Sequence, residues 1–503
     1  MAEMKDSTRI LEGEVLPPFS EEIYRPRIEA FKPRTADAEN FISNALEILT
    51  QQALEKENTK LIADDAIDTI RSIIEGIDRK LEAQINEILH HKDFQKLEGT
   101  WRGLHHLVNN SETGKKLKIK VLNIKKEEVG DTLKEKKGAA WDQSLLFKKI
   151  YGEEYDQHGG APFGCLIGDY QFDYSSSDID ILAGIARISQ AAHVPFIAAA
   201  KPELLDMETW QELTDRDDLS AIFDRPEYVK WRSLREDDAA NYIGLTLPRF
   251  LARLPYGPDT LPVKQFDFKE DVSGEDGVDH SKYVWSNAAY AMGVNINRAF
   301  TLHGWCANIA GVNAGGVVED LPVHTFKVDD RGFDMKCPTE VAIGNRLWNE
   351  LSTLGFIPLV HKKNTDQAVF FSAQSIGKPA EFAHDPDKTA GERLVAELPY
   401  IFAASRFAHY LCRILTNQIH QHKEGKQLKE ELTKWINNFV LQNPEVANEI
   451  DKARKPLAAA TVEIEDDPSN PGYYKAAFEL RPHFHLKGLK ATLRLVSKVS
   501  NKN

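Results

Sequence analysis

The sequence predicts an α/β protein with a mixed-sheet body, long N-terminal helices and a pair of C-terminal strands. Three observations predict this class. An apolar strand, a capped helix and a second apolar strand follow one another between residues 162 and 200. Apolar residues recur every three or four positions from Ile67 to Val108, and two runs near the C-terminus alternate apolar and polar residues. The first pattern indicates parallel strands, the second amphipathic helix and the third paired strands.

The composition is that of a globular protein of two or three domains. The 503 residues are 28% charged and 42% hydrophobic, without an unbroken apolar run near 18 residues. The first residues, MAEMKDSTRILEGEVLPPF, lack the apolar core of a signal peptide, which predicts a cytoplasmic location without membrane insertion. The net charge of −14 argues against a nucleic-acid partner. Four widely spaced cysteines, none in a CxxC pair, indicate isolated thiols.

Residues 1–38 contain four prolines and predict an extended N-terminal arm. Residues 39–115 form a predicted helical region with one long apolar stripe, as either one helix or two in line. We interpret this stripe as the inner face of a helix packed on its own domain, since the heptad of a coiled coil is not kept along it. The stripe comprises Ile70, Ile74, Ile77, Leu81, Ile85, Ile88, Phe94, Leu97, Trp101, Leu104 and Val108.

Residues 116–256 form a predicted α/β region. Leu117–Ile124 alternates like a strand, and the charged stretch Lys125–Lys137 predicts a surface helix. A strand over Pro162–Tyr170, a helix over Ser177–Ala192 with Ser177 or Asp178 as its cap, and a strand over Pro195–Ala200 follow. This order implies a right-handed crossover between parallel strands.

Residues 257–280, rich in Asp, Glu, Gly and Pro, predict a surface connection. Residues 281–462 form a predicted α/β and helical core. It contains a strand at Leu321–Val328, a helix at Thr339–Leu354, a hairpin of Phe356–Val360 with Ala368–Ser372, and mostly helix from Arg393 to Val440.

Residues 463–503 predict a hinge, Glu463–Pro471, and a strand-forming arm. Tyr474, Phe478 and Leu480 share one face of the first run, and Leu493 and Leu495 share one face of the second. Because an isolated hairpin is marginally stable, the strands either dock on their own chain or pair with another chain. The arm carries a local charge of +6 from Pro471 onward, which either steers it to another copy of the same acidic protein or protects a strand edge from mispairing.

No catalytic constellation is apparent, and we predict neither an enzyme nor a cofactor or metal site. The stretch GVNAGG, residues 311–316, lacks the Lys-Ser/Thr pair of a phosphate loop and indicates a turn. His483 and His485 have no third ligand of suitable spacing, and His90 and His91 point in different directions on a helix. Cys306 near His303 has neither an orienting group nor an oxyanion site.

Six stretches, in order along the chain from about Lys60, resemble the large subunit of the bacterial type VI secretion contractile sheath, the TssC or VipB family. They are LEGTWRGLHHLV (97–108), EYVKWRSLREDDAANYIGLTLPRFLARLPYG (227–257), GGVVEDLPVHTF (315–326), FFSAQSI (370–376), LPYIFAASRFAHYL (398–411) and NPGYYKAAFELRPHF (470–484). Each motif alone is weak, since none encodes a chemistry.

The resemblance implies a fold of phage-tail-sheath type and a structural role in a cytoplasmic machine. Family members pair with a small sheath subunit (TssB or VipA), and the pairs stack helically with further copies around a tube of Hcp hexamers on a baseplate. The sheath contracts to drive the tube outward and is disassembled by the ATPase ClpV. Strand exchange between neighbouring subunits, involving terminal segments, holds the lattice together.

One departure concerns ClpV. Larger family members carry, before the long helix, an N-terminal extension with a short Leu-rich helix that the ATPase recognises. The first 38 residues here are short and broken by prolines, and only Thr8–Val15 or Glu21–Phe31 could serve. Direct binding of ClpV by this chain is therefore left open.

Two sets of residues follow as candidates. The first, for pairing strands between subunits, is Tyr474, Phe478, Leu480, His483, Leu493 and Leu495. The second, for contact with the tube or a neighbour, is Arg406, Arg413 and His420, which recur every seven residues on a predicted helix; the alternative is an exposed charged face. The rival functions are an α/β scaffold that forms closed oligomers and a cytosolic enzyme without a recognisable site.

Overall fold

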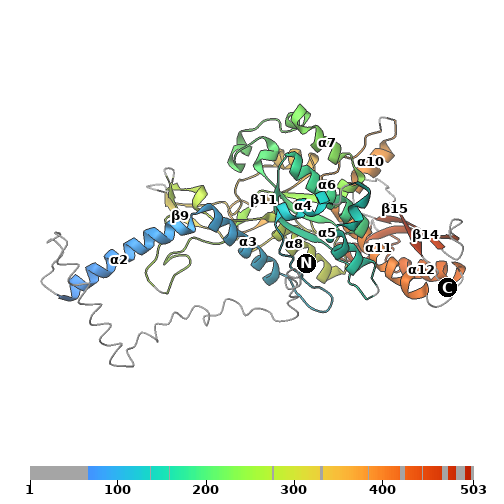
Figure 1. Ribbon diagram of the computed structural model, residues 1–503, viewed down its shortest axis with the longest axis horizontal. Coiled ribbons are helices and arrows are strands. Elements are labelled where there is room, and N and C mark those ends of the chain that lie inside the picture. The colour runs from blue at the N-terminus through green and yellow to red at the C-terminus, as the bar shows by residue number, and fades with distance from the viewer. Residues whose placement is uncertain are drawn as a thin grey trace, which may run out of the picture. The chain divides into compact units, whose positions relative to one another are not determined.

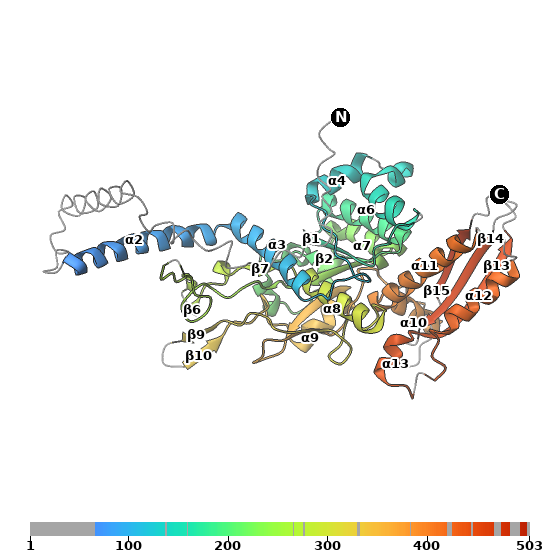
Figure 2. The ribbon, with the colours of Figure 1, turned by 90° about the horizontal axis from the view of Figure 1, so that it is seen from below.

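The computed structural model describes residues 66–135, 138–157, 159–264, 266–274, 277–328, 332–382, 384–419, 425–443, 446–466, 474–482 and 493–499 (Figures 1 and 2). The chain forms two compact units. The smaller takes its described residues from 66–95, 120–122 and 254–283, and the larger from 96–119, 123–253 and 284–499. The predicted arm, residues 1–38, lies outside the described residues, as do residues 39–65.

The smaller unit is built on α2 (Ala66–Leu89), and α3 (Lys92–Asn109) begins three residues after α2 ends. The predicted long helix is therefore two helices in line along the chain. The predicted surface connection, residues 257–280, contains the short strands β5 (Ser273–Gly274) and β6 (Gly277–Val278). It is anchored to α2, since Glu82 accepts the N–H of Lys269 at 3.2 Å and Asn86 accepts that of Asp271 at 3.0 Å.

A six-stranded mixed sheet, in the order β1-β2-β3-β11-β12-β8, forms the centre of the larger unit. The first four strands of this order run parallel, and β12 and β8 run antiparallel to their neighbours. The predicted mixed sheet and the hairpin after residue 356 are thus confirmed. The strands are β1 (Leu166–Phe172), β2 (Phe196–Ala200), β3 (Ile243–Leu247), β11 (Phe356–His361), β12 (Ala368–Phe370) and β8 (Val317–Val318).

The predicted strand–helix–strand unit is β1, α6 (Ser176–Ala192) and β2, with Leu166 opposite Phe196 in a parallel pair. The predicted cap is wrong by two or three residues: the hydroxyl of Ser175 caps α6 by accepting the N–H of Asp178. Asp178 is already engaged, because its carboxylate lies 2.8 Å from Lys126 Nζ.

Helices cover both faces of this sheet. Along β2, Ile197 packs with α8 (Ala288–His303), whereas Phe196 and Ala198 pack with α6, α7 (Val229–Arg235) and α9 (Asn345–Thr353). All five residues of β2 are buried. A parallel strand buried on both faces is expected to read as a continuous apolar run, which is how residues 196–200 read.

Three predicted elements differ from the structure. Leu117–Ile124 forms no ladder, because alternation alone does not make a strand without a neighbour to pair with. The predicted strand Leu321–Val328 shortens to β9 (Thr325–Val328), which pairs with β10 (Gly332–Met335). The predicted helix Thr339–Leu354 begins only at Asn345, after Gly344.

The remaining elements agree with the helical predictions. Helix α4 (Lys126–Glu135) matches the predicted surface helix, and α10, α11 and α12 account for the mostly helical stretch from Arg393. None of the helices in the described ranges has both the length and the apolar character needed to span a membrane. The helices of the larger unit not yet given bounds are α5 (Leu145–Phe147), α10 (Pro386–Val395), α11 (Leu398–Ile419), α12 (Gly425–Asn437) and α13 (Glu449–Arg454). The two short strands β4 (Phe250–Leu251) and β7 (Trp285–Ser286) pair with each other.

Near the C-terminus lies a separate three-stranded antiparallel sheet of β13 (Leu457–Asp466), β14 (Tyr474–Pro482) and β15 (Leu493–Val499). The two predicted terminal strands are β14 and β15. The predicted hinge is wrong for Glu463–Asp466, because these residues pair with β14 as part of β13. The rest of the predicted hinge, 467–471, lies outside the described residues.

Candidate assembly surfaces

The C-terminal sheet is anchored to its own chain through β14. Phe478 and Leu480 share one face of this central strand, as their alternation predicts, and their side chains are 2% and 1% exposed. They pack with α11 and α12 (Figure 2). Burial of two such side chains contributes about 3–6 kcal/mol to folding. For β14, the structure therefore selects docking on the chain's own body from the two alternatives.

Both edges of β14 are already paired. Phe478 lies opposite Val462 of β13 and Leu495 of β15. The backbone of Tyr474 lies opposite Asp466 and Val499, and Leu493 lies opposite Leu480. Of the remaining predicted pairing residues, His483 lies outside the described residues.

The backbone available to another chain lies at the outer edges of this sheet. Within the described residues, β15 pairs only with β14, and β13 meets a further partner only at Leu457, which bridges to Val440. An edge strand presents N–H and C=O groups that a strand of another chain can bind. Among the predicted pairing residues, Leu493 and Leu495 belong to such an edge strand.

The arginines of α11 contact their own chain. The guanidinium of Arg406 lies 5.0 Å from the ring centroid of Phe300 and 4.7 Å from that of Tyr410. Arg413 donates hydrogen bonds to the backbone oxygens of Gln157, at 3.3 Å, and Gly160. Both side chains are half-buried, so they do not form the exposed charged face of the alternative interpretation. The third predicted residue, His420, lies outside the described residues.

Helix α3 has two unlike faces. Gly99 lies so close to β7 that an added Cβ would be 2.5 Å from the backbone oxygen of Trp285. The Ser286 hydroxyl also donates to the Gly99 oxygen at 2.7 Å. On the other face, Leu97, Trp101 and Val108 are exposed, Trp101 to 62%. The prediction that this stripe is an inner face is wrong here, because the glycine face takes the packing position.

The stripe on α2 is exposed as well. Ile74, Ile77, Leu81 and Ile88 are between 40% and 56% exposed, whereas Leu89 is buried. Within the described residues, the apolar rows of both helices are therefore exposed rather than packed as inner faces. The spacing identified an apolar face correctly, but the side of the helix that packs on its own unit carries Glu82, Asn86 and Leu89 instead.

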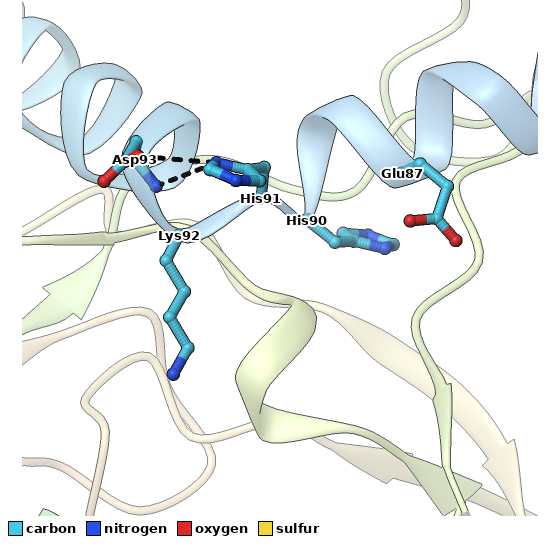
Figure 3. A pocket seen from close by; sticks show the side chains of 5 residues that line it. All are labelled: Glu87, His90, His91, Lys92 and Asp93. Carbon is cyan, nitrogen blue, oxygen red and sulfur yellow. Dashed lines mark hydrogen bonds and ion pairs between the residues drawn. The ribbon is translucent and has the colours of Figure 1, made fainter.

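A shallow hollow lies between the end of α2 and the start of α3, lined by Glu87, His90, His91, Lys92 and Asp93 (Figure 3). The two histidines point in different directions, as predicted. His91 Nδ1 accepts the N–H of Asp93 at 3.3 Å, and His90 Nε2 lies 3.5 Å from Glu270. Among the described residues, no group of three or more His, Cys, Asp or Glu is placed to hold a metal ion.

The other chemical candidates are structural. The loop around Gly311 and Gly315 is a turn, with positive φ at both residues and a hydrogen bond of 2.9 Å from Gly316 N–H to the Gly311 oxygen. Burial raises the pKa of Cys306 to about 12 and lowers that of His303. Cys306 is therefore a neutral thiol at physiological pH.

Two histidines that no sequence pattern singled out are His409, buried on α11, and His193, which follows α6. His409 Nε2 lies 2.9 Å from the Ala192 backbone oxygen, where α6 ends, and its ring meets that of Tyr155. His193 Nδ1 lies 3.2 Å from the Tyr242 hydroxyl. Burial lowers the pKa of His409 to about 3 and that of His193 to about 4. The neutral imidazole of His409 therefore joins α11 to the end of α6, whereas His193 contacts Tyr242, and only the distances in the fold reveal these contacts.

Two family models match the chain over most of its length. One, described as "EvpB/VC_A0108, tail sheath N-terminal domain", matches residues 71–377, and the other, "EvpB/VC_A0108, tail sheath gpW/gp25-like domain", matches residues 387–499. The chain belongs to the VipB tail sheath family. The resemblance to the sheath of type VI secretion systems is thereby confirmed, and with it the role of a structural sheath subunit.

A sheath relative in Pseudomonas aeruginosa strain PAO1 agrees with this membership. It is named "Type VI secretion system sheath protein TssC1" and is 53% identical over 499 residues, which cover 99% of each chain. The second matched sheath domain begins at residue 387, inside α10, and contains α11, α12 and the whole C-terminal sheet. The anchored sheet and the helices that hold it therefore lie in one sheath domain.

A solved structure titled "Cryo-EM structure of the anti-feeding prophage (AFP) baseplate, 6-fold symmetrised" is also similar to part of this sheath protein. The likeness covers 65% of this chain and 62% of that chain, at 10% identity and a TM-score of 0.29.

Proposed function

We propose that this sheath protein acts in the bacterial cytoplasm as the large sheath subunit. It pairs with a small subunit of the TssB or VipA kind, and the pairs stack with further copies around an Hcp tube on a baseplate. Contraction of this lattice propels the tube and its effectors. No chemistry in this chain is required, because the energy resides in contacts between subunits that improve on contraction.

The observation that carries this proposal is the C-terminal sheet, which combines a firm anchor with open edges. Its central strand is fixed by Phe478 and Leu480, so the sheet moves with the body of its own subunit. The outer edge of β15 has no strand partner in the described part of the chain. A strand added there by a neighbour makes several backbone hydrogen bonds, each contributing about 1 kcal/mol net. Such a joint keeps subunits attached while they rotate against each other.

Adjacent residues of β15 allow a direct test. Ser497 lies opposite Ala476 and Lys498 opposite Lys475. Neighbouring residues of a strand direct their N–H groups to opposite edges. One of the variants Ser497→Pro and Lys498→Pro therefore removes an N–H that pairs with β14, and the other removes an N–H at the outer edge of β15. Each variant is coexpressed with the small sheath subunit, examined by negative-stain electron microscopy, and tested alone for thermal stability.

We expect one variant to keep its melting temperature but lose the hollow tubes, and the other to melt earlier. Tubes in both variants, with unchanged stability, would contradict the strand-pairing proposal. Closed rings in place of tubes from the unmodified pair would favour the scaffold function. Direct recognition by ClpV would need residues 8–15 or 21–31, which lie outside the described residues.

A further inference from the structure

Helix α2 presents two sides of different character within the smaller unit. One side holds the segment around Lys269 and Asp271 through Glu82 and Asn86. The other side exposes a row of apolar side chains. Their exposed fractions are 51% for Ile74, 40% for Ile77, 42% for Leu81 and 56% for Ile88. Large aliphatic side chains exposed along one side of a helix in this way mark a binding surface.

The spacing of this row identifies the shape of what binds it. From Ile74, the row advances by three residues to Ile77, by four to Leu81 and by seven to Ile88, with Gln84 at the step between the last two. Alternating steps of three and four are the seam of a coiled coil, in which each side chain enters a hole between four residues of a facing helix. From Ile74 to Ile88 the spacing of a heptad is kept, with the polar Gln84 at one seam position, whereas the longer predicted stripe departs from it. The complementary partner is therefore an amphipathic helix.

We propose that the partner is residues 41–54 of the same chain, folded back antiparallel on α2. This segment reads FISNALEILTQQAL, and Ile42, Leu46, Leu49 and Ala53 are spaced by four, three and four residues. As a helix it would be about 21 Å long, at 1.5 Å per residue. The exposed row from Ile74 to Ile88 measures about 21 Å by the same rise. The segment is thus about as long as the exposed row, and the two apolar rows share the spacing of three and four residues.

Covalent attachment favours this segment over a helix from another molecule. Eleven residues, 55–65, separate it from the first residue of α2, which is longer than the two to eight residues that usually join antiparallel helices. Eleven residues are still few enough to hold the segment near its site at a millimolar effective concentration. A free helix would have to reach such a concentration, or bind more tightly, to displace it.

The test is hydrogen exchange, followed by mass spectrometry, on the full chain without other proteins. We expect the amides of residues 41–54 to exchange at least tenfold more slowly than those of an unstructured peptide. In the double variant Ile77→Lys/Leu81→Lys they exchange at the unstructured rate, because two charges would be buried in the seam. The matched control is Glu75→Lys, since Glu75 is exposed on the same helix but lies outside the row. Strands β1–β3 stay protected in every variant, which shows that the larger unit remains folded.

Three results would overturn the proposal. Exchange of residues 41–54 at the unstructured rate in the wild-type chain would show that they do not cover α2. Protection that increases with protein concentration would assign the row to a second copy of this chain. Protection that arises only after a small sheath subunit is added would assign it to that partner. The experiment does not use tube formation, so its failure would leave the proposed function standing.

Discussion

Arg249 and Glu340 form a two-pronged ion pair between residues 91 positions apart. Arg249 Nε lies 2.8 Å from Glu340 Oε2, and Nη2 lies 2.6 Å from Oε1. The backbone N–H of Arg249 donates to Oε2 as well, at 3.1 Å. The Glu340 side chain is 4% exposed. Burial lowers the pKa of Arg249, but the adjacent carboxylate more than offsets this and holds the pKa above its usual value.

We expect Arg249→Ala to lower the free energy of unfolding by about 2–3 kcal/mol, because a buried carboxylate loses its guanidinium. The matched control is Arg225→Ala, which removes the partner of Asp206 in a pair of similar length, 2.7 Å, whose side chains are 47% and 44% exposed. Exposed pairs contribute less than about 1 kcal/mol. Urea denaturation of the three proteins checks this, and equal losses in the two variants would refute it.

Local periodicity predicted the elements of the fold, but not the partners that decide their exposure. Arg249 and Arg253 belong to one stretch, RFLARLPYG, whose role was not apparent, since their partners Glu340 and Glu98 lie far away in sequence. The spacing identified the apolar rows of α2 and α3. We predicted that these rows face the interior of their own units, whereas in the described structure they are exposed. The choice of face depends on close contacts such as that of Gly99 with Trp285, which no local pattern reveals.

The same reasoning explains the C-terminal sheet. Alternation in residues 474–480 predicted the strand and the shared face of Phe478 and Leu480 correctly. It could not show that this face meets α11 and α12, because those helices are recognised as neighbours only in the fold. Strand β13 was missed because its acidic end, Glu463–Asp466, resembles a linker.

Trp101 and Leu107 lie on different sides of α3, one exposed and one buried, and allow assembly to be separated from stability. Trp101 is 62% exposed and Leu107 is 4% exposed. We expect Trp101→Ala to change the free energy of unfolding by less than about 0.5 kcal/mol, as for other surface positions. Leu107→Ala should cost about 2–5 kcal/mol. If Trp101 contacts another sheath subunit, its variant also loses co-purification with the small subunit.

The decisive comparison is co-purification at a temperature where both variants are folded. Retention of the small subunit by Trp101→Ala, at wild-type yield, would exclude this face from the interface. A loss only in Leu107→Ala would mean that stability, rather than the exposed face, governs assembly.

Glu397, just before α11, makes the stability of the protein depend on pH. Burial raises its pKa to about 7, only partly offset by a hydrogen bond from Gln374. Between pH 4.5, the ordinary pKa of a glutamate in the unfolded chain, and pH 7, the folded state thus holds a proton that the unfolded state has released. This contribution to stability is present below pH 4.5 and is lost as the pH rises to 7. We expect Glu397→Gln to raise the free energy of unfolding by about 3 kcal/mol at pH 8 and to change it little at pH 4.

The measurement is the difference between Glu397→Gln and wild type in urea denaturation at a series of pH values. The difference is needed because His409 and His193 have depressed pKa values and contribute the opposite slope below pH 6.5. Those histidines are unchanged in the variant, so their contributions cancel. A difference that does not vary with pH would show that Glu397 is not the group responsible.

Arg406 and Arg413 test whether α11 has a role beyond its own fold. Because Arg413 holds the backbone oxygens of Gln157 and Gly160, Arg413→Gln should cost about 1–2 kcal/mol of stability. Arg406→Gln, which removes a cation between Phe300 and Tyr410, should cost about 1 kcal/mol. If these residues also contact the tube or a neighbouring subunit, Arg406→Glu/Arg413→Glu should abolish tubes that the double glutamine variant still forms. Equal loss of tubes in both double variants would mean that the arginines act only within their own chain, and normal tubes in the glutamate variant would exclude the contact.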